Sequence, residues 1–251
     1  MRKVKAVIGA ALAVGAVAAL PSAASADATA GTRAHAAGSD PIVVPAAVRV
    51  RIIRGQKALD KAGEYVDKAA PDKAINSLRG ARANMYAAWR AAKYGIQHPP
   101  PPPPEAKTVA HASQDGTPPT YATPEQTAIA VLNFQHEVES STFGLIDDAK
   151  GAIKAELSIT MFAALDRRDS AITFISQQPV PDPETTPDGF VGYDVLMPAI
   201  VPDLDDELAA GNEMLTDGAL TAGEKRIVSL ANAQITATEA RVNTLFAPPQ
   251  A

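Results

Sequence analysis

The stretch that decides the fold is residues 123–178, which reads TPEQTAIAVLNFQHEVESSTFGLIDDAKGAIKAELSITMFAALDRRDSAITFISQQ. Thr123 is placed to cap a helix, Pro124 suits the first helical position, and Gln126 completes a capping box. The apolar residues that follow form two groups on a helical wheel. The groups are Val131, Phe134, Val138 and Leu145, and then Ile129, Leu132, Phe143 and Ile146. A helix that is apolar on two faces packs on both sides, so this one is predicted to lie centrally.

A short polar segment, Asp147 to Gly151, divides this stretch. Without a break, a helix over residues 123–178 would be roughly 80 Å long at 1.5 Å per residue, which is far beyond ordinary helix lengths. We therefore expect a helical hairpin, and one long bent helix is the alternative. The return helix carries Ile153, Leu157 and Ala164 along one face, with Glu156 beside them.

Two further hairpins are predicted, over residues 46–96 and 195–246. Pro71 is placed to begin the second helix of the former, and Thr221 to Glu224 form a capping box in the latter. The apolar lines are Val48, Ile52, Gly55, Leu59, Ala62 and Val66; Leu196, Ile200, Leu204, Leu208, Gly211 and Leu215; and Ile227, Leu230, Gln234, Thr238, Val242 and Leu245. The fold class is therefore all-α, with six helices in three antiparallel hairpins. They form either one elongated bundle or a hairpin tethered to a four-helix bundle.

The segments outside the hairpins predict export and a spacer. Residues 1–26 are typical of a cleaved secretory signal, with Arg2, Lys3 and Lys5 before an apolar run, and an uncleaved anchor is the alternative. Cleavage at Ala26-Asp27 would leave a soluble extracytoplasmic protein, with a flexible leader over residues 27–45. Residues 97–122 form a proline-rich linker whose six consecutive prolines (99–104) should extend as a polyproline II rod of roughly 19 Å. Residues 179–194 are an acidic proline-rich loop, and residues 247–251 are a tail.

Composition narrows the chemistry. The chain has no cysteine, which excludes disulfides, thiolate metal sites and cysteine nucleophiles. Aromatic residues make up 5% of the chain and alanine is abundant, so we expect a slim core of alanine and aliphatic side chains. Recognisable catalytic patterns, such as His-Glu-x-x-His, Gly-x-Ser-x-Gly or a glycine-rich phosphate loop, are missing from the sequence. A non-catalytic role is favoured over an enzyme.

One hypothesis is a metal site in the helix bundle. His136 and Glu139 lie one turn apart, and Glu156 on the next helix could be a third ligand. Carboxylate-bridged bundle sites use Glu-x-x-His, and iron, manganese or zinc would be the ion. In His136/Glu139 the two residue types come in the opposite order, and the sequence has no second Glu-x-x-His. The alternative is that His136 and Glu139 bond each other and neighbouring core groups without any metal.

Another hypothesis is a face that binds an anionic polymer. It lies on the second helix and consists of Arg79, Arg82, Tyr86, Arg90 and Lys93. Arginine pairs with phosphate and carboxylate, and tyrosine can stack on sugar rings. An anionic cell-wall polymer or another envelope protein is the expected partner, and nucleic acid is not expected for an acidic chain of net charge −5. A plain solvated helix surface is the alternative.

Charge is also segregated along the chain. Residues 46–98 hold 11 basic and 4 acidic residues, whereas residues 181–217 hold 10 acidic and no basic ones. The two segments could attract each other or pair subunits, or both could be solvated faces. The sequence predicts an exported, non-catalytic helical binding or scaffold protein of the cell envelope. The alternative is a metal-binding or oxidoreductase bundle centred on His136, Glu139 and Glu156.

Overall fold

The computed structural model describes residues 44–98, 122–146, 149–178, 192–216 and 220–246. The helices are α1 (Ala46–Asp67), α2 (Pro71–Gln97), α3 (Pro124–Gly144), α4 (Ala152–Ser176), α5 (Tyr193–Leu196), the 3-10 helix η1 (Pro198–Ile200), α6 (Val201–Thr216) and α7 (Ala222–Leu245). No strand occurs in these segments, so the all-α prediction is confirmed. Within them, every helix is too short or too polar to cross a bilayer.

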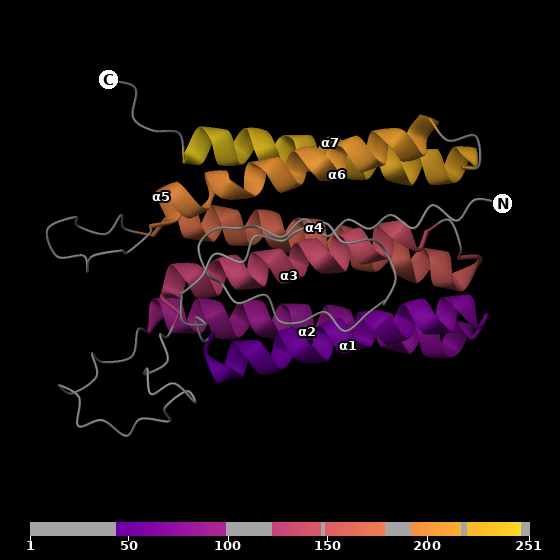
Figure 1. Ribbon diagram of the computed structural model, residues 1–251, viewed down its shortest axis with the longest axis horizontal. Coiled ribbons are helices and arrows are strands. Elements are labelled where there is room, and N and C mark those ends of the chain that lie inside the picture. The colour runs from indigo at the N-terminus through magenta and orange to yellow at the C-terminus, as the bar shows by residue number, and fades with distance from the viewer. Residues whose placement is uncertain (1–43, 99–121, 147–148, 179–191, 217–219, 247–251) are drawn as a thin grey trace, which may run out of the picture.

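The three hairpins are stacked as layers (Figure 1). The hairpin α1–α2 lies on one side of α3–α4, and α6–α7 lies on the other. Helix α2 packs against both α3 and α4, and α7 packs against α4. The first hairpin therefore packs directly on the second, and the arrangement is one bundle rather than a tethered hairpin.

Local sequence signals explain where the helices begin and end. At α3, the backbone N–H of Thr123 donates to Gln126 Oε1 (2.9 Å), and the N–H of Gln126 donates to Thr123 Oγ1 (3.2 Å). Thr221 and Glu224 form the same reciprocal pair at α7. Gly151, with φ of 56°, immediately precedes α4 and adopts a backbone conformation that favours glycine. Residues 123–178 therefore form two helices.

The buried side chains form one continuous core through all three layers. All six apolar positions predicted to line α1 are buried. Helices α3 and α4 are buried on more than one side, as expected for a central layer. Between α2 and α4, the rings of Trp89 and Phe174 meet edge to face at 5.7 Å. This core fixes the middle hairpin between the other two.

Two details of the third hairpin differ from the sequence prediction. Helix α6 begins at Val201 rather than near residue 195, because α5 and a 3-10 turn at Pro198 precede it. In α7, Leu230 and Leu245 were predicted to be buried but are 51% and 45% exposed. The buried face consists of Val228, Ala231, Asn232, Ile235, Thr238 and Val242. A small-residue face permits close contact with α6, where a Cβ added at Gly211 would come within 2.0 Å of Asn232 Oδ1.

Several predicted segments lie outside the described residues. They are the signal sequence (1–26), the leader up to residue 43, the proline run (99–104), the acidic loop up to residue 191 and the tail (247–251).

Candidate functional site

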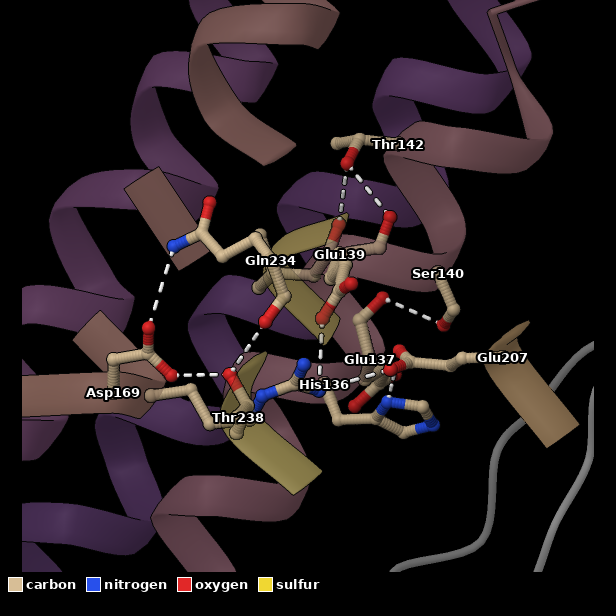
Figure 2. Close-up of polar contacts among 11 residues, drawn as sticks. His136, Glu137, Glu139, Ser140, Thr142, Asp169, Glu207, Gln234 and Thr238 are labelled. Atoms are coloured by element: carbon tan, nitrogen blue, oxygen red, sulfur yellow. Dashed lines mark hydrogen bonds and ion pairs between the residues drawn. The ribbon is translucent and has the colours of Figure 1, made fainter. Parts of the chain in front are cut away.

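A cluster of ionisable side chains is buried where α3, α4 and α6 meet. It consists of His136 and Glu139 from α3, Arg168 from α4 and Glu207 from α6, and we refer to it as the buried cluster. Arg168 is 2% exposed, and its Nη1 lies 2.9 Å from Glu139 Oε2 and 3.0 Å from Glu207 Oε2. His136 Nδ1 contacts Glu207 Oε1. Figure 2 shows Glu207 approaching His136 and Glu139 from a separate helix.

The two glutamates of the buried cluster have opposite pKa shifts. Burial raises the pKa of Glu139 well above its ordinary value, because Arg168 only partly offsets desolvation and the charge of Glu207 adds to it. Burial by itself would also raise the pKa of Glu207, but Arg168 and His136 outweigh it and lower that pKa. Arg168 tends to lose charge through burial, yet the two glutamates hold its pKa above the ordinary value. Glu207 is therefore the ionised partner of Arg168, and Glu139 is the carboxyl that more readily holds a proton.

Several polar atoms of the buried cluster lack hydrogen-bond partners. They are Nδ1 of His136, Oε2 of Glu139, Oε1 of Glu207, and Nε and Nη2 of Arg168. Three of these atoms nevertheless belong to ion pairs, because Glu139 Oε2 lies 2.9 Å from Arg168 Nη1 and His136 Nδ1 contacts Glu207 Oε1. Donor atoms of His136, Glu139 and Glu207 lie within 4.8 Å of one another. The arrangement can therefore act as a buried ion network or hold a cation.

A neighbouring polar contact attaches α7 to α4 (Figure 2). Thr238 donates its hydroxyl hydrogen to Asp169, and Gln234 Nε2 lies 2.9 Å from Asp166 Oδ1. Arg241 adds an ion pair to Asp169 at 3.6 Å. Polar side chains therefore link the second and third hairpins beside the buried cluster.

The structure brings together two of the three residues predicted to bind metal. His136 and Glu139 share the buried cluster, but Glu156 lies with α2, where Arg82 and Arg79 contact its carboxylate at 2.9 and 3.4 Å. The nearby third carboxylate is Glu207. The sequence pattern could have indicated that Glu207 is buried. It lies three residues after Leu204 and four before Gly211, on the buried face of α6.

The predicted anionic-polymer face of α2 is directed largely toward α4. Arg82 is held by Glu156 and by Thr160 Oγ1 at 3.1 Å. Arg167 lies over the ring of Tyr86, and Lys93 lies over the ring of Phe174. Arg79 is exposed but lies beside Glu156, and Arg90 is exposed. The five residues Arg79, Arg82, Tyr86, Arg90 and Lys93 therefore do not form a single open cationic face.

Exposed cations gather instead on α1. They are Arg49, Arg51, Arg54, Lys57 and Lys61. None of the ion pairs within the described segments involves these side chains. In the layer on the other side of the stack, α6 exposes Asp205, Asp206 and Glu213. The charge segregation along the sequence is therefore also a segregation between the outer layers.

No family model, curated protein or solved structure matches this chain. Its class is the one that the geometry defines, an all-α bundle of stacked hairpins with a buried charge cluster.

Proposed function

We propose that this protein is an exported, non-catalytic binding protein of the cell envelope, and that it binds an anionic wall polymer through α1. The observation that carries the proposal is the row of exposed cations on α1. Export is expected from residues 1–26.

The cations on α1 are arranged along one face. Arg54, Lys57 and Lys61 follow one another at intervals of three and four residues, so they lie on the same side of the helix. The buried residues Ile52, Leu59 and others occupy the opposite side. From Arg54 to Lys61 the row covers about 10 Å along the axis. A linear polymer with repeated phosphates or carboxylates can contact such a row at several points.

The separation of charge supports the same role. An acidic protein as a whole repels a polyanion, but the exposed carboxylates of α6 lie in the far layer. Helix α1 itself exposes Asp60, Glu64 and Asp67 beside its five cations, so its own charges still favour an anion. Charges of the far layer are screened over a Debye length, about 8 Å in physiological salt.

The test measures, by isothermal titration calorimetry at low salt, how tightly the purified protein binds purified poly(glycerol phosphate). The variant Arg54→Gln/Lys57→Gln/Lys61→Gln should bind at least about tenfold more weakly, which corresponds to about 1.4 kcal/mol. The matched control Lys73→Gln/Lys150→Gln/Arg226→Gln removes the same charge from three exposed positions elsewhere and should bind nearly as the unmodified protein does. Binding should weaken as salt is added. Equal loss in both variants, or no binding by the unmodified protein at low salt, would show that the proposal is wrong.

A further inference from the structure

Three side chains of the buried cluster offer donor atoms of the kinds that bind metal ions. Glu139 Oε2 lies 2.9 Å from Arg168 Nη1, His136 Nδ1 contacts Glu207 Oε1, and Glu139 and Glu207 are only 3% and 5% exposed. One donor atom from each of His136, Glu139 and Glu207 lies within 4.8 Å of the others, close enough for a single ion to be bound by all three side chains.

We propose that His136, Glu139 and Glu207 bind one divalent transition-metal ion, such as zinc, manganese or iron. One imidazole and two carboxylates form a donor set that suits these ions. Donors at about 2.0–2.2 Å from a shared ion lie about 3–4 Å apart, so rotation of the two flexible glutamate side chains is enough to close the site. The inference does not depend on the polymer-binding proposal.

Arg168 fits this site as an outer partner of the ligands. Its Nη1 contacts Oε2 of both glutamates, and this contact orients the carboxylates and leaves Oε1 of Glu207 directed at His136. Outer-shell hydrogen bonds of this kind commonly fix the position of metal ligands. When both carboxyl groups are ionised to bind an ion, they and the guanidinium together carry one net negative charge, and the half-buried Asp203 nearby can add a second. The site can therefore balance an ion of charge +2.

The site has a route for the ion. The His136 side chain is 20% exposed, whereas the two glutamates are buried. An ion can enter past the imidazole, and water can complete the coordination on that side. The competing arrangement is that Arg168 alone compensates the carboxylates and no metal binds.

The experiment uses the untagged protein, stripped with chelator and then titrated calorimetrically with zinc and with manganese. We expect about one ion per chain, as a single three-ligand site implies. Binding should weaken at least about tenfold in His136→Ala and in Glu207→Gln. The matched control is Glu156→Gln, which changes a carboxylate that is also buried but is held by Arg79 and Arg82. It should bind metal as the unmodified protein does.

A spectroscopic measurement separates loss of ligands from loss of fold. X-ray absorption of the zinc-loaded protein should show nitrogen and oxygen neighbours, with the imidazole signal missing in His136→Ala. Circular dichroism should show that both variants stay helical. Absence of stoichiometric metal in the unmodified protein, retention of affinity in Glu207→Gln, or equal loss in Glu156→Gln would overturn the assignment. Polymer binding by the chelator-stripped protein should be unchanged, so either proposal can fail alone.

Discussion

Gly55 of α1 leaves no room for a side chain against Phe134 of α3. A Cβ added at Gly55 would lie 2.1 Å from Cζ and 2.9 Å from Cε1 of that ring. Phe134 is among the largest fully buried side chains, so it cannot move into solvent. This contact sets how closely the first hairpin packs on the second.

Gly55→Ala should therefore lower the free energy of unfolding by about 1–3 kcal/mol, as overpacked cores do. Gly63→Ala is the matched control on the same helix, because nothing lies within 4 Å of its added Cβ. That control should raise stability by up to about 1 kcal/mol through helix propensity. Urea unfolding of both variants is the measurement. Stabilisation by both substitutions would contradict the close contact with Phe134.

Glu207→Gln should lower stability by about 3 kcal/mol near neutral pH, because Arg168 loses its ionised partner. Although burial opposes it, Arg168 and His136 hold the folded-state pKa of Glu207 below its ordinary value of 4.5. A carboxyl with a lowered folded-state pKa stabilises above its unfolded pKa, and that contribution disappears as the pH falls through the folded-state pKa.

The difference in stability between the unmodified protein and Glu207→Gln should therefore be full above about pH 5.5 and shrink steadily below about pH 4.5. Urea unfolding in the presence of chelator, repeated across this range, measures it. A difference that grows as the pH falls would mean that Glu207 is not the ionised member of the buried cluster.

Arg168→Met should cost about 3–5 kcal/mol, since it leaves two buried carboxyl groups facing each other without a cation. Replacing the triad together, as Arg168→Met/Glu139→Leu/Glu207→Leu, should recover most of that loss. Arg167→Met is the control, because this neighbour is exposed and stacks on Tyr86. It should cost less than about 1 kcal/mol. Thermal unfolding distinguishes the variants, and a triple variant no more stable than Arg168→Met would count against an ionic triad.

Thr123→Ala and Thr221→Ala should each cost about 1 kcal/mol, because each removes a capping box at the start of a helix. Thr236→Ala is the control within α7. Its hydroxyl donates to the carbonyl of Asn232 at 3.0 Å, a bond that the helix does not need. Denaturant unfolding should show no loss for that control, and an equal loss at all three positions would rule out a capping effect.

The spacing of apolar residues correctly predicted the buried face of helices that pack along one side only. Every position of the apolar line from Val48 to Val66 is buried, because α1 packs on its neighbours along one face. The prediction was only partly right in α7, where Thr238 and Val242 are buried as predicted but Leu230 and Leu245 are exposed. In this helix Ile235 is buried and Leu230 is exposed. Which residues are buried there depends on the side of α7 that α6 packs against.

Only part of the buried cluster could be predicted from the sequence, for a related reason. His136 and Glu139 share one helix, so their spacing brings them together whatever the tertiary packing is. Which third carboxylate joins these two residues depends on how the neighbouring layers are aligned. The spacing of residues within one helix carries no information about that alignment. Glu156 faces the arginines of α2, and Glu207 reaches the buried cluster from α6.

The layered stack has a consequence for how the chain folds. Each hairpin packs mainly on the one next to it in the sequence, so most contacts close short loops and their entropic cost is small. Such a chain can assemble layer by layer from the middle hairpin outward. The last layer is attached partly by polar contacts such as Thr238 with Asp169. Its amides should therefore exchange with solvent before those of α3 and α4, in a graded order rather than all at once.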